Sequence, residues 1–68
     1  MDNKLGKYIK ELRKDKKLSQ TEFGKALGFS ARTVSDWENG NTEPNLKTVK
    51  EIVKFCDITY EDFFDEVN

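Results

Sequence analysis

The stretch LSQTEFGKALGFSARTVSDWENG, residues 18–40, contains two short helical patterns separated by one turn. Ser19 with Glu22 three residues later is a capping box, which predicts a helix that begins directly after the serine. Gly28 is expected to end this helix, because glycine adopts the left-handed backbone angles of a sharp turn. Gly24 is expected where this helix presses on the next one, since only a small side chain lets two helices cross closely.

The second pattern predicts a helix over residues 31–39, with Ser30 as its N-cap and the pair Asn39-Gly40 at its end. Val34 and Trp37 share one face at helical spacing and are expected in the core. The opposite face of this helix then points outward. A rigidly held, exposed helix of this kind fits the major groove of DNA.

Three further helices are predicted on either side of this stretch by apolar side chains that repeat at the helical period. They are expected over residues 3–16, from Asn45 as N-cap to about Cys56, and over 60–67, where Thr59 and Asp62 form an acidic capping box. Five short helices with short connections predict an all-α, compact five-helix fold. A chain of 68 residues has room for one small core, so residues 1–68 are expected to form a single domain.

The charges are distributed unevenly along the chain, although the net charge is only −1. Residues 1–56 contain all 12 lysines and arginines against 8 acidic residues, whereas residues 57–68 contain five acidic residues and no basic one. A net charge of −1 is unfavourable for a nucleic-acid binder. A mildly basic body with an acidic C-terminal helix nevertheless leaves a DNA-binding face possible.

Several classes of function find no support in the composition. The chain has one cysteine and no histidine, so neither a disulfide nor the usual zinc ligands are expected, and no metal or cofactor is predicted. A glycine-rich phosphate loop and a nucleophile–base set are missing, which argues against an enzyme or a small-molecule substrate. No apolar run reaches about 18 residues, so a cytoplasmic protein without membrane contact is expected.

The stretch 18–40 resembles the Cro and phage-repressor type of helix-turn-helix, also called the XRE family. The similarity includes the preceding pair Leu12-Arg13, the ending Trp37-Glu38-Asn39-Gly40 and the loop around Pro44. It implies a lambda-repressor-like DNA-binding fold and a bacterial or phage-encoded transcriptional regulator, a repressor that reads DNA with helix 31–39. It also implies a near-palindromic operator in double-stranded DNA, bound by a homodimer.

The resemblance further implies individual roles. Arg13 would pair with Glu38 and tie the recognition helix to the first helix. Five residues would face base edges: Ala31, Arg32, Thr33, Ser35 and Asp36. Five others would approach backbone phosphates, the last two through their backbone N–H groups: Ser19, Gln20, Ser30, Asn39 and Asn41.

Three questions remain open at this level. Asp36 either accepts a hydrogen bond from the amino group of cytosine or pairs with Arg32 four residues earlier. The last predicted helix has a stripe of apolar and aromatic residues: Tyr60, Phe63, Phe64 and Val67. This stripe either closes the core or contacts a second copy of the chain. The alternative function is a protein-interaction module on the same fold, with weak or lost DNA binding, which the acidic tail and Asp36 favour.

Overall fold

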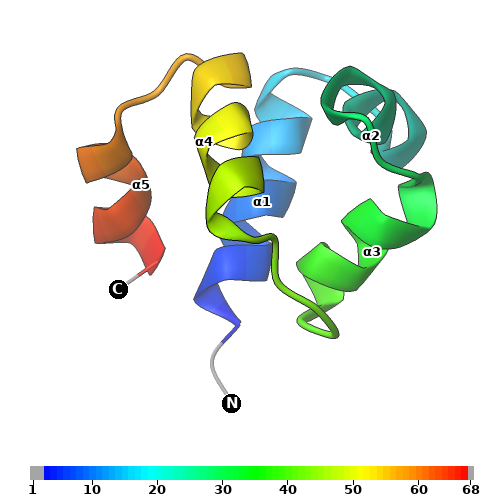
Figure 1. Cartoon of the computed structure of the whole chain (residues 1–68), viewed down its shortest axis with the longest axis horizontal. Coiled ribbons are helices and arrows are strands. Elements are labelled where there is room, and N and C mark those ends of the chain that lie inside the picture. The colour runs from blue at the N-terminus through cyan, green and yellow to red at the C-terminus, as the bar shows by residue number, and fades with distance from the viewer. Residues whose placement is uncertain (1–2, 68) are drawn as a thin grey trace.

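The computed structural model describes residues 3–67, and five helices make up most of this range (Figure 1). They are α1 (Lys4–Asp15), α2 (Gln20–Leu27), α3 (Ala31–Asn39), α4 (Leu46–Phe55) and α5 (Tyr60–Val67). No strand occurs among the described residues. The predicted all-α, five-helix fold is confirmed, with helix ends close to those expected.

Short polar side chains cap the helices where the sequence predicted them. Ser19 and Glu22 form the complete capping box of α2, and Ser30 accepts a hydrogen bond from the backbone of Thr33 at the start of α3. Asn45 and Thr59 do the same for α4 and α5. Each cap satisfies a backbone N–H group that has no partner within its own helix.

Each of the helices α1 to α4 is followed, within two residues of its end, by a residue with a positive φ angle that turns the chain. Gly28 and Gly40 have φ of 86° and 78°, as their sequence positions predict. Lys17 and Asp57 adopt φ of 59° and 56° at the ends of α1 and α4, although neither is a glycine. The backbone N–H of Phe29, the residue after Gly28, donates to the Gly24 carbonyl at 2.7 Å. This hydrogen bond closes the turn between α2 and α3.

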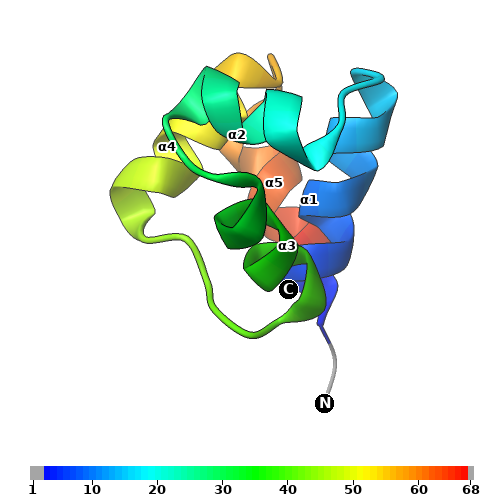
Figure 2. The ribbon, with the colours of Figure 1, turned by 90° about the vertical axis from the view of Figure 1, so that its right-hand side faces the viewer.

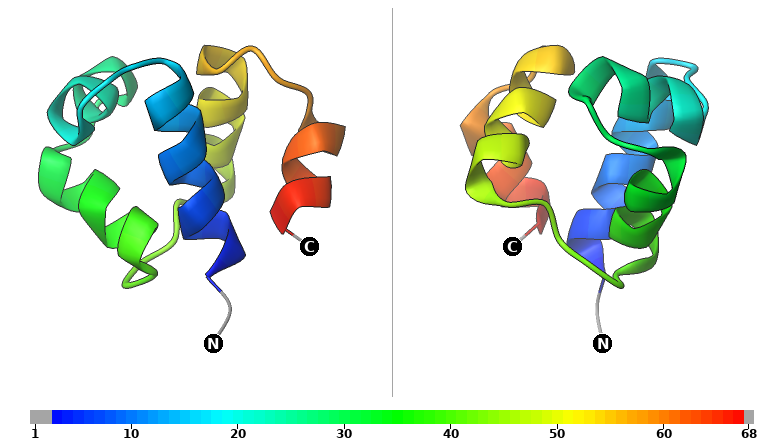
Figure 3. Two further views of the ribbon diagram at one scale, coloured as in Figure 1. Left: turned by 180° about the vertical axis from the view of Figure 1, so that it is seen from behind. Right: turned by 45° about the vertical axis from the view of Figure 1, so that its right-hand side comes forward.

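The core is formed by one face of every helix. Among the described residues the buried apolar side chains are Ile9, Leu12, Phe23, Val34, Trp37, Val49, Ile52, Val53 and Phe63. The helix α2 packs most extensively on α3, and α1 packs on both α3 and α5. The helix α5 therefore lies on the side of α1 and α4 that is turned away from α2 and α3 (Figures 1 and 3).

Two glycines allow close backbone approaches. A Cβ atom on Gly24 would collide with the carbonyl oxygen of Phe29. The close approach predicted at Gly24 thus involves the turn before α3 rather than the body of α3. A Cβ atom on the buried Gly6 of α1 would collide with the carbonyl oxygen of Trp37, so this glycine sets how closely α1 and α3 pack.

We expect Gly6→Ala to destabilise the protein by about 1–3 kcal/mol, because the added methyl group overpacks the contact between α1 and α3. An alanine inside a helix normally gains about 1 kcal/mol over glycine, so the expected sign is opposite to that of helix propensity. Urea unfolding followed by far-UV circular dichroism measures the change. Lys10→Ala, on an exposed position of the same helix, is the control and should change stability by less than about 0.5 kcal/mol. A Gly6→Ala variant more stable than the parent would contradict the packing described here.

Candidate nucleic-acid interface

The outward face of α3 presents the residues that the sequence predicted to face bases. Figure 2 shows α3 in front of α1 and α5 when the molecule is viewed from this side. Val34 and Trp37 are buried beneath it, and the turn residue Phe29 packs edge-on against the Trp37 ring at 5.0 Å between centroids. Arg32 is the most exposed of the five predicted residues. The other four are half-buried: Ala31, Thr33, Ser35 and Asp36. One stiff helix thus holds all five.

Arg32 and Asp36 lie one turn apart on this face, and Nε of Arg32 is 3.9 Å from Oδ1 of Asp36. The arginine side chain is 88% exposed and that of the aspartate 28%. An ion pair this long and this exposed contributes little to stability. It does hold the guanidinium over the outer face of α3, where its remaining N–H groups point into solvent.

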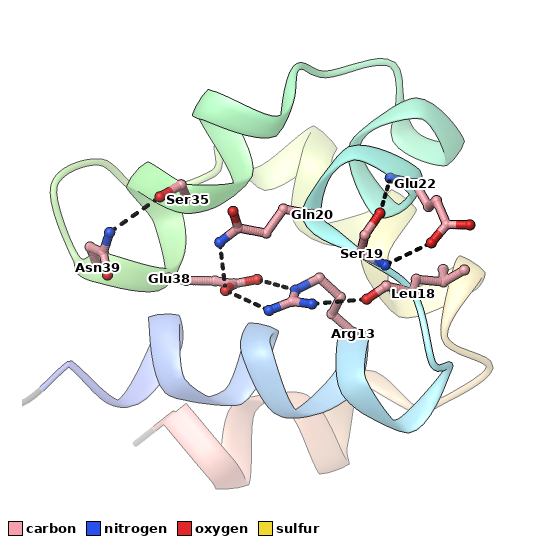
Figure 4. Close-up of polar contacts among 8 residues, drawn as sticks. All are labelled: Arg13, Leu18, Ser19, Gln20, Glu22, Ser35, Glu38 and Asn39. Atoms are coloured by element: carbon pink, nitrogen blue, oxygen red, sulfur yellow. Dashed lines mark hydrogen bonds and ion pairs between the residues drawn. The ribbon is translucent and has the colours of Figure 1, made fainter.

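Glu38, on the inner side of α3, is the anchor of this helix. Its carboxylate accepts from Nε of Arg13 at 2.7 Å and from a second guanidinium nitrogen at 3.1 Å (Figure 4). Arg13 also donates to the carbonyl of Leu18 at 2.8 Å, and the hydrogen bond to Glu38 raises the pKa of Arg13. The side chains are 12% and 3% exposed, so the expected structural pair is present and largely removed from water.

Asn3 makes a second connection to α3 that the sequence analysis did not predict. Its amide nitrogen donates to the backbone carbonyl of Glu38 at 2.9 Å, while its oxygen caps α1 by accepting from the Gly6 N–H at 3.2 Å. The carbonyl of Glu38 is one of the last of α3 and lacks a partner within the helix. An asparagine just before the first apolar stripe was the available signal, since asparagine is a preferred N-cap.

The start of α2 carries two of the predicted phosphate ligands, Ser19 and Gln20. The Ser19 hydroxyl accepts from the Glu22 N–H at 3.1 Å, and the Ser19 N–H donates to the Glu22 carboxylate at 2.9 Å. The hydrogen bond from the Ser19 N–H lowers the pKa of the Glu22 carboxyl. Gln20 donates through Nε2 to Oε1 of Glu38 at 3.1 Å. The backbone N–H of Ser19 is therefore engaged, and the Gln20 amide is attached to the Arg13–Glu38 pair.

The predicted route from Asn39 and Asn41 to phosphate is wrong as stated. Asn39 is the last residue of α3 rather than a residue beyond it, so its N–H is directed into the preceding turn of the helix. The N–H of Asn41 donates to the Asp36 carbonyl at 2.9 Å and is used in ending α3. Asn39 also donates through its side chain to Ser35 at 3.2 Å. Any phosphate contact by Asn41 must come from its exposed side chain.

The remaining predicted phosphate ligand, Ser30, caps α3, and its hydroxyl lies 3.1 Å from that of Thr33. Within residues 3–67 no group of acidic or cysteine side chains is arranged to hold a metal ion. The same range contains no helix with the length and apolar character needed to cross a bilayer.

The stripe on α5 divides between core and surface. Phe63 is 2% exposed and packs against Tyr8 at 5.5 Å between ring centroids, so of the two alternatives it closes the core rather than contacting a second copy. Tyr60 and Phe64 are 46% and 43% exposed, and Val67 is half-buried. The acidic residues of this helix lie with it on the side turned away from α3, so they do not face the candidate interface (Figure 3).

Known proteins share this arrangement. The chain is 53% identical over 49 residues to the ImmF control region 10 kDa protein of Bacillus phage phi105. The matched residues cover 72% of this chain and 54% of that protein. It is 34% identical over 62 residues to the antitoxin PezA of Streptococcus pneumoniae, covering 91% of this chain and 39% of the antitoxin. The chain thus spans about half or less of the length of these relatives.

A solved structure of the P22 c2 repressor protein in complex with a synthetic operator has the same fold. The two structures superimpose with a TM-score of 0.77 at 30% sequence identity, over 87% of this chain and 89% of the repressor chain. The model of the helix-turn-helix family matches residues 9–63, which include the capping box, the glycine turn and the Arg13–Glu38 pair. The chain belongs to the helix-turn-helix family, in its Cro and phage-repressor branch.

Proposed function

We propose that this chain is a sequence-specific DNA-binding transcriptional regulator, a repressor that reads the major groove with α3. The observation that carries the proposal is the exposed outer face of α3, anchored from behind by Trp37 and by the Arg13–Glu38 pair. An α-helix fits the major groove, where base edges differ between the four base pairs. The repressor fold that this chain resembles was solved on its operator, which supports the same use of the fold here.

Arg32 is the main reading residue in this proposal, because a guanidinium forms two hydrogen bonds to guanine in the commonest specific contact with DNA. Asp36 either accepts from the amino group of a neighbouring cytosine or holds Arg32 in place. The remaining base-facing residues contact the bases through short side chains: Ala31, Thr33 and Ser35. Phosphate contacts are proposed for Ser19, Gln20, Ser30 and the exposed side chains of Asn39 and Asn41, which position the protein without reading sequence.

This role requires access to bacterial or phage DNA, and we therefore propose the bacterial cytoplasm as the place of action. The separation of charge supports the role. The five acidic residues beyond residue 56 belong to α5 and the turn before it, whereas the basic residues all lie earlier in the chain. The phosphates at α3 are therefore not opposed by the acidic helix.

We expect Arg32→Ala to lower affinity for the operator by about 1–3 kcal/mol and to relax the preference at one position of the site. The operator is first obtained by selection of bound sequences from a random DNA pool. Gel shifts at several salt concentrations then compare selected with scrambled duplexes. Lys10→Ala is the control, since it removes a charge of the same sign from α1 without altering α3. Unchanged affinity and selectivity in Arg32→Ala would show that Arg32 does not read DNA.

We further propose that the chain binds a near-palindromic operator as a homodimer through α4 and α5. An apolar groove between these helices is lined by Val53, Ile58 and Tyr60, and the α4 side adds two lysines and one acidic residue: Lys50, Glu51 and Lys54. The other side, α5, carries acidic residues on its surface: Glu61, Asp62, Asp65 and Glu66. A surface with an apolar centre and opposite charges on its two sides is complementary to itself under a two-fold axis.

The size of the molecule is compatible with this assembly. The described residues measure 27 × 26 × 22 Å along the principal axes. Two copies side by side extend over more than the roughly 34 Å between half-sites one helical turn apart, so their size leaves room for two α3 helices at that spacing. Because α5 lies on the side away from α3, contact through α4 and α5 leaves both reading helices free (Figure 1).

We expect Tyr60→Asp to shift the protein toward the monomer in sedimentation equilibrium, because it places a charge in the groove beside other acids. Affinity for an operator with two half-sites should fall, while affinity for a single half-site should stay the same. Leu46→Asp is the matched control, since Leu46 is 63% exposed and lies outside the groove. Equal association of Tyr60→Asp and the parent protein would exclude this interface.

A further inference from the structure

Ser35 and Asn39 lie one turn apart on α3, and a hydrogen bond joins their side chains (Figure 4). The Asn39 amide donates through Nδ2 to Oγ of Ser35 at 3.2 Å. Both residues share a face of the helix with Arg32 and Asp36, because positions three, four and seven residues apart lie on one side. The hydrogen bond therefore belongs to the surface that is proposed to meet the bases.

The direction of this hydrogen bond leaves the Ser35 hydroxyl as a donor. A serine hydroxyl has one hydrogen to donate and two lone pairs that accept. The Asn39 amide uses one of the lone pairs and leaves the hydrogen unused. Among residues 3–67 this amide is the one hydrogen-bond partner of the Ser35 hydroxyl, so its hydrogen is available to an acceptor on DNA.

The other pair of hydroxyl groups at this helix has no such fixed direction. The hydroxyl oxygens of Ser30 and Thr33 lie 3.1 Å apart, and either of them can be the donor. An amide nitrogen, in contrast, only donates. Accepting a hydrogen bond also polarises a hydroxyl group, which makes it a stronger donor in turn. Ser35 is thus the hydroxyl of α3 whose role toward DNA the protein itself determines.

We infer that Asn39 is a positioning residue for base recognition, which holds the Ser35 hydroxyl as a donor toward an acceptor on a base edge. In the major groove guanine, adenine and thymine all present acceptors, whereas cytosine presents only an amino group that donates. The operator is therefore expected to exclude cytosine at the base that Ser35 faces. The inference rests on the proposed function and adds to it the class of base that one residue reads.

Affinities for two duplexes that differ at this base measure the preference. The operator is selected from a random DNA pool, and the base that Ser35 reads is the one whose preference Ser35→Ala removes. Exchanging it for cytosine, with the complement exchanged as well, should weaken binding of the parent about three- to tenfold, the size of one hydrogen bond. In Asn39→Leu the hydroxyl can turn a lone pair toward the cytosine amino group, so the same exchange should weaken binding less than about twofold.

A double-mutant cycle separates this orientation from any other effect of Asn39. In the Ser35→Ala background, Asn39→Leu should leave the ratio of the two affinities unchanged. Asn41→Leu is the matched control, since it removes an exposed asparagine side chain that makes no hydrogen bond to Ser35. Loss of a phosphate contact in either asparagine variant weakens both duplexes equally and does not change their ratio. Neither Ser35 nor Asn39 belongs to the core, and circular dichroism verifies that each variant is folded.

Side-chain amide NMR of the free protein tests the hydrogen bond itself. Ser35→Ala should shift the side-chain amide resonances of Asn39 and leave those of Asn41 in place. Asn39 resonances that do not move would overturn the inference, as would an Asn39→Leu protein that rejects cytosine as strongly as the parent does. A Ser35→Ala protein that keeps every base preference would overturn it as well. A parent protein that selects no sequence would instead overturn the proposed function and this inference with it.

Discussion

The bidentate ion pair between Arg13 and Glu38 is the constraint on which the placement of α3 depends. A helix of nine residues is too short to persist in water by itself, so its orientation must come from packing and from fixed polar contacts. The pair joins α1 to α3, and the extra bond from Arg13 to the Leu18 carbonyl joins both to the start of α2. Three helices are therefore set relative to one another by one guanidinium and one carboxylate.

This arrangement has a cost that the surroundings offset. Removing two charges from water is unfavourable unless the pair is well aligned and its other hydrogen-bonding positions are used. Here the Gln20 amide donates a further hydrogen bond to the Glu38 carboxylate. Among the described residues no buried polar side-chain atom lacks a hydrogen-bond partner. The Asn3 amide satisfies the Glu38 carbonyl as well. Such a completely bonded network favours one geometry of α3 over its alternatives, which is what reading a base sequence requires.

Much of the fold was predictable because the caps and the apolar period agree. Ser19, Ser30, Asn45 and Thr59 mark the helix starts in the sequence and act as caps in the structure. The ends of α1 and α4 were less apparent, since a lysine and an aspartate occupy the left-handed positions where glycine is usual. The close approach at Gly6 depends on a carbonyl of α3, more than 30 residues away along the chain, and no local pattern reports such a contact.

The candidate site was predicted less completely than the fold. The Arg13–Glu38 pair followed from the resemblance, because residues so far apart in sequence show no spacing that pairs them. The N–H of Asn41 was expected to be free, but ending α3 uses it. Phe63 shares a stripe with Tyr60 and Phe64, and helical spacing alone does not tell which member of a stripe the neighbouring helices cover. Burial is decided by α1 and α4, which meet α5 only in the folded chain.

The central claim is that α3, backed by the start of α2, is the surface that meets DNA. Backbone amide NMR of the protein, titrated with a selected duplex that contains one half-site, tests it directly. The account predicts that the resonances of residues 31–36 and of Gln20 and Thr21 shift, while those of residues 60–67 stay in place. Shifts concentrated on α5, with α3 unaffected, would contradict it and would favour a different surface for binding.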